Sequence, residues 1–356
     1  MVEAWSRVTD SAYTFIIAEA GVNHNGSLER ARRMVDAAVK AKADAIKFQT
    51  FKASHLVSAQ APKAEYQQSS GEQGESQLDM LRRLELREEG HRALFDYCQE
   101  KNIMFLSTAF DKESVDFLDA LGVEIFKVPS GELRNRILLE HIARKNKPVI
   151  LSTGMEMLGQ IEEAVDIFRQ ADTEFVLLYC VSCYPAGEGQ IDLKVIETLK
   201  EKFAVPVGFS DHTVGIKVAL ASVLKEACVI EKHFTIPDDG TVLSPDHDFS
   251  LRPGELEELV AGIREAEKMR TGVTSTAYDK TGEKVISAGE KKIADVVRKS
   301  LVAARDINRG ETLCEKMIAV KRPGTGLSPK DIFGVINKKA RVMIPKDTLI
   351  LQEMVE

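Results

Sequence analysis

Two histidines stand at the ends of apolar segments that follow each other in the chain, in "GFSDHT" (208–213) and "EKHFT" (231–235). Imidazole is a common ligand of divalent metals, so His212 and His233 together could hold one cation and leave positions open for water and substrate. The alternative is that each is an isolated structural histidine. The other five are interpreted as loop or surface residues: His24, His55, His91, His141 and His247.

Two lysines lie inside apolar segments, where a cation is costly unless it meets an anion. Lys47 occurs in "AIKFQTF" and Lys127 in "IFKVPSGE". With the hydroxyl groups at the ends of other segments they could bind a phosphate and a carboxylate. The alternative is that one lysine only pairs with Glu19 or Glu132. The hydroxyl groups belong to Ser130, Ser152, Ser182 and Ser210.

The segments that carry these residues read as eight strands, each apolar first and polar last. Amphipathic segments such as "LGQIEEAVDIFRQA" separate them with apolar residues at helical spacing. This alternation predicts a parallel sheet closed into a (β/α)8 TIM barrel, with a doubly wound open sheet as the alternative. Lys232 alternates with its neighbours, should point away from the barrel interior and is interpreted as structural. The predicted strands are 14–21, 45–51, 103–110, 125–132, 148–155, 175–183, 206–212 and 229–235.

The chain length of 356 residues suits one large domain and a smaller one. We predict the barrel over 1–273, a polar linker over 274–296 and a small domain over 297–356. In that last part, short apolar runs broken by turns such as "NRG" and "RPGTG" predict mostly β structure. The connection 52–87 is too long for a plain turn and is interpreted as a lid or substrate loop.

Composition excludes several classes of protein. Apolar residues make up 44% of the chain and charged residues 29%, the balance of a soluble globular protein. No apolar run approaches the roughly 20 residues of a membrane helix, and the start lacks a signal peptide. The net charge of −7 argues against a nucleic-acid binder. Five scattered cysteines, with a single CxxC at Cys180 and Cys183, predict reduced thiols in a cytoplasm.

Longer motifs follow one another along nearly the whole chain, from Phe15 to Val355. They are "IIAEAGVNHNG", "AIKFQTF", "APKAEYQ" with "ESQLDM", "FKVPSGEL", "ILSTGM", "GFSDHT", "EKHFT", "PDHDFSL" and "KRPGTG". In this order they resemble the sialic acid synthases. These are the phosphoenolpyruvate-dependent synthases of N-acetylneuraminate, legionaminate and pseudaminate.

The resemblance implies a (β/α)8 barrel followed by a domain similar to type III antifreeze proteins, the SAF domain. It also implies a domain-swapped homodimer, in which Arg322 reaches the sugar bound by the other subunit. Family members condense phosphoenolpyruvate with the open-chain aldehyde of an N-acylated mannosamine, which gives a nine-carbon 2-keto acid and phosphate. A divalent metal on His212 and His233, typically Mn²⁺ with Mg²⁺ or Co²⁺ as alternatives, would polarise the aldehyde.

Carried over position by position, the resemblance divides the strand ends into groups with different roles. Lys47 and Thr108 belong to the carboxylate side of phosphoenolpyruvate. Glu19, Glu132 and His233 are the candidate catalytic residues, the glutamates for proton transfer and water activation. The phosphate side consists of Lys127, Ser130, Ser152, Ser182 and Ser210. The sugar side consists of Gln49, Tyr184, Asp246 and Arg322.

The chain also departs from the family pattern. In "YCVSCYP", Tyr179 replaces a histidine and Ser182 stands where asparagine or threonine is common, and "LSPDHD" lacks a glycine before "PDH". The acceptor stays open between N-acetylmannosamine, its 6-phosphate and a 2,4-diacetamido-trideoxy analogue. More distant alternatives are a metal-dependent pyruvate aldolase and a surface binder that acts through the C-terminal domain.

Overall fold

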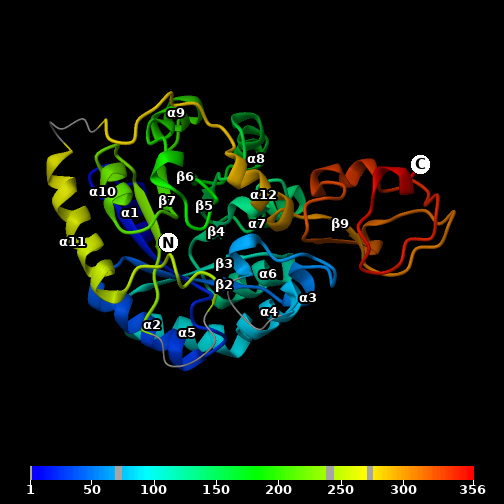
Figure 1. The fold of residues 1–356 in the computed structure, drawn as a ribbon, viewed down its shortest axis with the longest axis horizontal. Helices are drawn as coiled ribbons and strands as arrows, with labels where there is room; N and C mark the ends of the chain where they lie inside the picture. Colours follow the sequence, from blue (N-terminus) through cyan, green and yellow to red (C-terminus); the bar gives the residue numbers. More distant parts are fainter. Residues whose placement is uncertain (1, 69–73, 238–243, 271–275) are drawn as a thin grey trace.

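The computed structural model describes residues 2–68, 74–237, 244–270 and 276–356 (Figure 1). Eight parallel strands pair in chain order, and β1 pairs with both β2 and β8, so the sheet closes. The (β/α)8 barrel predicted from the strand–helix alternation is therefore confirmed. The strands are β1 (Phe15–Gly21), β2 (Ala45–Thr50), β3 (Met104–Ala109), β4 (Phe126–Val128), β5 (Val149–Ser152), β6 (Phe175–Cys180), β7 (Val207–Asp211) and β8 (Val229–His233).

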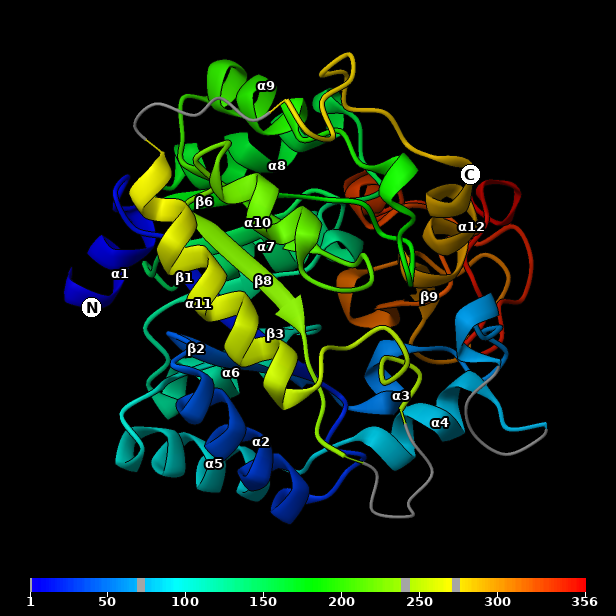
Figure 2. The same ribbon diagram turned by 60° about the vertical axis from the view of Figure 1, so that its left-hand side comes forward.

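Most of the helices surround the barrel and bury an apolar face against the sheet (Figure 2). In α2 (Leu28–Ala41), buried residues recur every three or four positions from Ala31 to Ala38. Ser27 begins this helix by accepting a hydrogen bond from the backbone N–H of Arg30. None of the described helices is long and apolar enough to cross a membrane. The other helices are α1 (Val2–Thr9), α3 (Ala53–Leu56), α4 (Gln77–Leu84), α5 (Glu88–Glu100), α6 (Lys112–Leu121), α7 (Arg136–Ala143), α8 (Leu158–Gln170), α9 (Lys194–Phe203), α10 (Lys217–Val223), α11 (Pro253–Met269) and α12 (Ala288–Val297).

The described parts of the long connection after β2, residues 52–68 and 74–87, are folded. They contain α3, a 3-10 turn at Glu65–Gln67, and α4. Leu56 and Met80 from this connection pack with Val22 and Phe110 in an apolar cluster of their own. The connection therefore forms a wall beside the strand ends, as expected of a substrate loop.

The C-terminal residues form a small domain with a separate apolar core, as predicted. Strand β9 (Ser300–Ala303) pairs antiparallel with β10 (Ile318–Lys321), and much of the rest consists of turns and 3-10 helix. In Figures 1 and 2 this domain lies beside α3 and α12. Its core includes Leu301, Ile307, Leu313, Ile344 and Ile350.

The described part of the predicted linker is attached to the barrel. The carboxylate of Asp192 accepts hydrogen bonds from the backbone N–H groups of Lys280 at 2.9 Å and Gly282 at 2.8 Å. Helix α12 occupies the end of the linker and runs one residue beyond its predicted limit at 296. The described part of the linker is therefore held against the barrel at Lys280 and Gly282.

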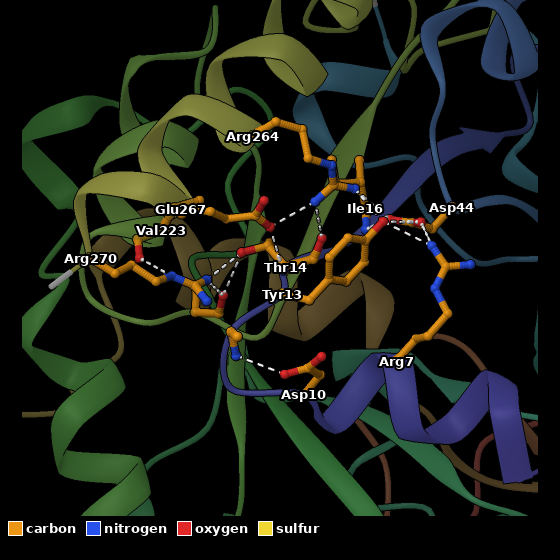
Figure 3. A network of polar contacts seen from close by, with 12 residues as sticks. Arg7, Asp10, Tyr13, Thr14, Ile16, Asp44, Val223, Arg264, Glu267 and Arg270 are labelled. Atoms are coloured by element: carbon orange, nitrogen blue, oxygen red, sulfur yellow. Dashed lines mark hydrogen bonds and ion pairs between the residues drawn. The ribbon is translucent and has the colours of Figure 1, made fainter.

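The N-terminal end of the barrel is closed by α1, whose Trp5 and Val8 pack on the starts of the strands. At the same end Arg270, directly after α11, donates hydrogen bonds to the backbone oxygens of Ser11 and Ala227 (Figure 3). These contacts join the first helix and the last barrel helix to the sheet. Polar contacts at this face stabilise the fold, because barrel active sites lie at the opposite face.

Asp44, directly before β2, is the centre of this network (Figure 3). Its carboxylate accepts hydrogen bonds from the Tyr13 hydroxyl at 2.5 Å and from the backbone N–H of Ile16 at 2.8 Å. It also pairs with Arg7 and Arg264, and the Arg264 guanidinium lies 4.1 Å from the centre of the Tyr13 ring. A buried carboxylate with this many partners is well satisfied.

Three histidines that the sequence assigned to loops or the surface are buried. His24 and His91 are each 1% exposed, and His247 is 4% exposed. His247 Nδ1 lies 2.9 Å from the Thr235 hydroxyl oxygen, so this buried imidazole is hydrogen-bonded inside the protein. The sequence interpretation was wrong for His91, which lies buried on α5, whereas His24 and His247 do lie in loops and only their burial was unforeseen. An isolated histidine carries no sign of the residues that will cover it.

Burial of His24 and His91 predicts stability that is lost in acid. Burial lowers the pKa of His24 to about 3 and that of His91 to about 4. An unfolded histidine has a pKa of about 6.5, so below that pH the unfolded chain binds more protons than the folded one. The free energy of unfolding is therefore expected to fall by roughly 2 kcal/mol per histidine between pH 8 and pH 5.

Urea unfolding of the wild type and His91→Phe at both pH values measures this effect. Phenylalanine keeps an aromatic ring beside Phe105 and Phe117, which surround His91. The variant should lose about 2 kcal/mol less than the wild type between pH 8 and pH 5. His141→Gln, at a half-buried helix position, is the control. Identical acid losses in the wild type and His91→Phe would contradict the prediction.

Candidate active site

A cavity lies at the C-terminal ends of the barrel strands, where the sequence predicted the site. Most of the predicted site residues line it. Glu132 and Ser182 are outside its lining. Those that line it are Glu19, Lys47, Gln49, Thr108, Lys127, Ser130, Ser152, Tyr184, Ser210, His212, His233, Asp246 and Arg322.

The strand register explains why these side chains meet. Glu19 on β1 stands opposite Lys47 on one side and opposite His233 on the other. Ser210 on β7 stands opposite Glu231 on β8. Paired residues of parallel strands point to the same face of the sheet, so polar residues at matching positions form one layer inside the barrel.

Lys47 is at the centre of a buried charge network. Its Nζ lies 2.7 Å from Glu19 Oε2, 3.0 Å from Thr108 Oγ1 and 3.6 Å from Glu231 Oε2. Burial raises the pKa of Glu19 to about 7, against the opposing effect of Lys47. Glu19 can therefore take up or release a proton near neutral pH.

Glu231 joins this network to Lys127. Lys127 Nζ lies 3.7 Å from Glu231 Oε1 and donates a hydrogen bond to Ser152 Oγ at 2.7 Å. The Ser210 hydroxyl donates to Glu231 Oε1 at 3.1 Å. Burial raises the pKa of Glu231, but Lys127 and Lys47 outweigh it and the net shift is downward. Glu231 therefore remains a carboxylate that holds the two lysines in place.

The sequence reasoning gave Glu231 no role, although a signal was available. Glu231 and His233 are two residues apart on one strand and so share a face. Lys232 between them points the other way, where its Nζ lies 2.7 Å from Asp211 Oδ2. The structural role predicted for Lys232 is confirmed.

Hydroxyl and thiol groups converge on Gly154, just after β5. Ser130 Oγ accepts a hydrogen bond from the Gly154 N–H at 2.9 Å and lies 3.2 Å from Cys180 Sγ. A Cβ atom at Gly154 would lie 2.2 Å from Ser182 Oγ, so this close approach requires glycine. Ser182 is therefore directly beside the predicted phosphate side, although it does not line the cavity.

His212 and His233 meet with their ring centres 5.7 Å apart. Burial lowers the pKa of both imidazoles, so they are neutral at physiological pH, the form that ligates metals. His212 Nδ1 lies 2.9 Å from the Val181 carbonyl oxygen, which leaves Nε2 for another partner. His233 Nδ1 is buried without a hydrogen-bond partner. These donors fit a divalent metal.

A metal between these two histidines would have two protein ligands. Among the described residues, a group of three possible metal ligands within 4.8 Å of one another occurs at a different place, at His55, Asp111 and Glu113. Two protein ligands at His212 and His233 would leave the other positions to water and substrate, as catalytic metal sites require.

The predicted sugar side gathers around Gly21. A Cβ atom there would lie 3.3 Å from Glu19 Oε1 and 3.4 Å from both Asp246 Oδ2 and Gln49 Nε2. The φ of Gly21 is +51°, which also favours glycine. Burial raises the pKa of Asp246 to about 7, so two carboxyls in this corner can exchange protons near neutral pH.

Aromatic rings complete the wall next to the histidines. The Tyr184 ring centre lies 5.0 Å from that of Tyr66 and 5.5 Å from that of Phe249. Phe249 in turn lies 5.1 Å from His233. The sequence reasoning assigned no role to these two rings, although Tyr66 lies in the motif "APKAEYQ" and Phe249 in the motif "PDHDFSL".

Glu132, predicted to be catalytic, contacts the start of the C-terminal domain. Its Oε1 lies 2.9 Å from Lys299 Nζ, and its Oε2 accepts a hydrogen bond from Asn135 Nδ2 at 2.7 Å. Lys299 also donates to the Phe110 carbonyl oxygen. In this arrangement the pair anchors the domain, and proton transfer by Glu132 stays a prediction.

Arg322 enters the cavity from the C-terminal domain of the same chain. Its backbone N–H donates to the Leu56 oxygen at 3.0 Å, and its own oxygen accepts from the Ser58 N–H at 3.0 Å. Arg322 Nε is buried without a hydrogen-bond partner, so a donor is available to a ligand. The exchange of this domain between two subunits is not tested by one chain and stays a prediction.

Comparisons with known proteins agree with this architecture. The model of the NeuB family matches residues 34–275, and that of the SAF domain matches residues 298–356. The N,N'-diacetyllegionaminic acid synthase of Campylobacter jejuni is 44% identical over 95% of this chain and 98% of its own. The synthase of the same name from Legionella pneumophila is 42% identical over 96% and 94%.

Among solved structures, the spore coat polysaccharide biosynthesis protein SpsE of Bacillus subtilis superposes with a TM-score of 0.82. It is 34% identical, and the match covers 96% of this chain and 95% of that one. The matches to these relatives thus extend over both the barrel and the C-terminal domain. The chain therefore belongs to the NeuB family, the sialic acid synthases, and carries a C-terminal SAF domain.

Proposed function

We propose that this protein condenses phosphoenolpyruvate with an N-acylated mannosamine-type aldose, giving a nine-carbon 2-keto sugar acid and phosphate. The observation that carries the proposal is the buried layer of Lys47, Lys127, Glu19 and Glu231 next to two neutral histidines. Such a layer offers cations for an anionic donor and carboxyls for proton transfer in one closed site.

Phosphoenolpyruvate carries a carboxylate and a phosphate, and the cavity has two cationic sides to match. Lys47 and Thr108 would take the carboxylate, because their polar atoms are adjacent at 3.0 Å. Lys127 would take the phosphate with nearby hydroxyl groups. These are the hydroxyls of Ser130, Ser152, Ser182 and Ser210.

The reaction forms one carbon–carbon bond, and at carbon 2 it forms one carbon–oxygen bond to water and breaks one carbon–oxygen bond to phosphate. Carbon 3 of phosphoenolpyruvate attacks the aldehyde carbon, and the aldehyde oxygen takes up a proton. Water adds to carbon 2, and the resulting tetrahedral intermediate expels phosphate to leave the 2-keto group. Glu19 and Asp246 are placed to move these protons because the pKa of each is about 7.

His212 and His233 would hold the divalent metal, for which we propose Mn²⁺, with Mg²⁺ or Co²⁺ as alternatives. When bound, such an ion supplies Lewis-acid polarisation of the aldehyde carbonyl. The residues of the chain orient the acceptor. Gln49, Asp246 and Arg322 offer polar atoms to sugar hydroxyls, and Tyr184 offers a ring face.

We further propose that the acceptor is a 2,4-diacetamido-2,4,6-trideoxy sugar, the kind that leads to a legionaminate-type product. The relatives from Campylobacter jejuni and Legionella pneumophila, 44% and 42% identical, are named N,N'-diacetyllegionaminic acid synthases. The loop side of the cavity is apolar, with Leu56, Met80, Leu81 and Leu84, which suits methyl and acetyl groups. A 6-phosphate would need a further cation there. N-acetylmannosamine and the pseudaminate precursor are the alternatives.

The test is phosphate release from phosphoenolpyruvate by metal-stripped protein, with and without Mn²⁺. N-acetylmannosamine, its 6-phosphate and the diacetamido sugar are compared, and mass spectrometry identifies the product. Metal-dependent release with the diacetamido sugar is expected. No release with any of the three would reject the synthase proposal. A keto sugar acid formed from pyruvate in place of phosphoenolpyruvate, which mass spectrometry would detect without any phosphate release, would indicate an aldolase.

We propose a homodimer that exchanges the C-terminal domains, so that the partner supplies the arginine at each site. An exchanged domain makes the same contacts with the partner's barrel that Arg322 and Lys299 make here. Co-expression of Arg322→Ala with Lys127→Met tests this. In an exchanged heterodimer one of the two sites keeps both residues. Half of the dimers in a random mixture are heterodimers, so activity should return to about a quarter of the wild type. Activity no higher than that of each parent variant would contradict the exchange.

We place the protein in the cytoplasm. All five cysteines are free, and four of them are buried. Buried thiols without disulfides fit a reducing compartment.

A further inference from the structure

Glu290, in the first turn of α12, is 1% exposed and reaches back into the barrel. Its Oε1 accepts hydrogen bonds from the backbone N–H groups of Met155 at 2.9 Å and Ser182 at 3.1 Å. These two groups follow the ends of β5 and β6. One carboxylate oxygen outside the barrel proper therefore joins two neighbouring strand ends.

The second oxygen of Glu290 has a separate partner. Oε2 accepts a hydrogen bond from the Ser287 N–H at 3.0 Å, and Ser287 Oγ accepts from the Glu290 N–H at 3.2 Å. This is a capping box, which begins α12. A capping box needs only one carboxylate oxygen, so the contact with Met155 and Ser182 is an additional function of the same side chain.

Both backbone groups belong to the phosphate side of the proposed site. Met155 follows Gly154, whose N–H donates to Ser130 Oγ. Ser182 carries a hydroxyl that lies beside Gly154. Met155 also has a φ of +61°, a left-handed conformation that a residue with a side chain adopts only when its surroundings hold it. The carboxylate of Glu290 supplies part of that hold.

The packing of α12 keeps Glu290 in place. A Cβ atom at Gly289 would lie 2.7 Å from Cys183 Sγ, so the helix backbone approaches the β6 end closely. Ile293 and Ala294 of α12 share an apolar cluster with Met155. Helix α12 therefore packs in one position against the barrel. This position places the Glu290 carboxylate at the predicted phosphate side.

We propose that Glu290 is a positioning residue for phosphoenolpyruvate. By holding the N–H groups of Met155 and Ser182, it fixes the hydroxyls that receive the phosphate. Glu290 belongs to α12, the helix that leads to the C-terminal domain. Phosphate binding therefore also depends on how α12 packs against the barrel. The inference rests on the proposed function, since it assigns Glu290 to the phosphoenolpyruvate half of that site.

Glu290→Ala in the full-length protein is the test. Loss of charge-assisted hydrogen bonds of this kind predicts a 10- to 100-fold rise in Kd and KM for phosphoenolpyruvate. KM for the sugar should change less than about threefold, because the sugar-side residues Gln49 and Asp246 belong to β2 and to the segment after β8, and only Tyr184 follows β6. Calorimetric titration with phosphoenolpyruvate gives the Kd without turnover. Glu283→Ala, an exposed position in the same segment, is the matched control.

Glu290→Gln keeps the shape of the side chain and one oxygen acceptor, so it gives a reading even if the alanine variant unfolds. Its effect on Kd should be smaller and in the same direction. Unchanged phosphoenolpyruvate affinity in a folded variant would overturn the inference, and so would equal rises in KM for both substrates. Failure of the wild type itself to bind phosphoenolpyruvate would reject the proposed function instead.

Discussion

Replacing both His212 and His233 by alanine is expected to lower metal-dependent phosphate release by at least about 10³-fold. Stabilisation of developing charge by a bound metal contributes several kcal/mol, and each 1.4 kcal/mol is a factor of about ten in rate. The fold should survive, because two buried imidazoles are lost without leaving a charge behind. Both histidines are neutral in the folded protein, since burial lowers their pKa values.

The measurement has two parts that separate metal binding from turnover. Calorimetry with Mn²⁺ reports binding to the purified protein, and a coupled assay reports phosphate release. His141→Ala is the control, because His141 pairs with Asp116 on a helix outside the cavity. Wild-type metal affinity in the double variant would contradict the assignment of these histidines as ligands, whatever its activity.

Lys299→Met is expected to reduce the free energy of unfolding by about 3–5 kcal/mol, the cost of leaving one member of a buried ion pair uncompensated. Lys299 and Glu132 are each 1% exposed by side chain and lie 2.9 Å apart. The variant leaves the Glu132 carboxylate buried with the Asn135 amide beside it. Urea unfolding followed by circular dichroism measures the loss.

The double variant Glu132→Gln/Lys299→Met removes both charges and should recover most of that stability. A double variant as unstable as Lys299→Met would show that the ion pair is not what holds the domain. The turnover rate of the folded double variant then defines the role of Glu132. Activity near the wild type would assign Glu132 to anchoring alone, whereas a folded, inactive protein would support proton transfer by this residue.

The position of most site residues could be predicted because the strands of a (β/α)8 barrel pair in chain order and all end at the same side of the barrel. Once strands are parallel and each ends in polar residues, those ends share one face. Lys47, Lys127, His212 and His233 were located by this reasoning, and the structure places all four in one cavity. The same logic applies to Glu231, which shares the face of His233 and needed only the two-residue period to be found.

Glu132 shows where the reasoning stops. The sequence predicted a strand over 125–132, but β4 ends at Val128 and a 3-10 turn follows at Ser130–Glu132. The turn replaces the alternation of a strand, so a residue two positions after Ser130 no longer shares its face. Its partner Lys299 is far away in the sequence, and only the folded chain brings the two together.

Buried histidines were missed for a related reason. His91 lies on α5 among Phe105 and Phe117 from β3 and α6, so its environment is made by other elements. Helical spacing shows which face is buried only when apolar residues mark it, and a histidine counts as polar in that pattern. The contacts of Glu290 with the strand ends could not be predicted either, because its partners are backbone N–H groups far away in the sequence, which no side-chain pattern marks.

The pairing of Arg322 with the segment from Leu56 to Ser58 has a consequence for protein engineering. The contact consists of two backbone hydrogen bonds, which do not depend on the side chains on either strand. A C-terminal domain from a relative with another acceptor could therefore dock on this barrel with its own arginine in register. The acceptor preference of such chimeras would show how much of it is set by the barrel and how much by the C-terminal domain.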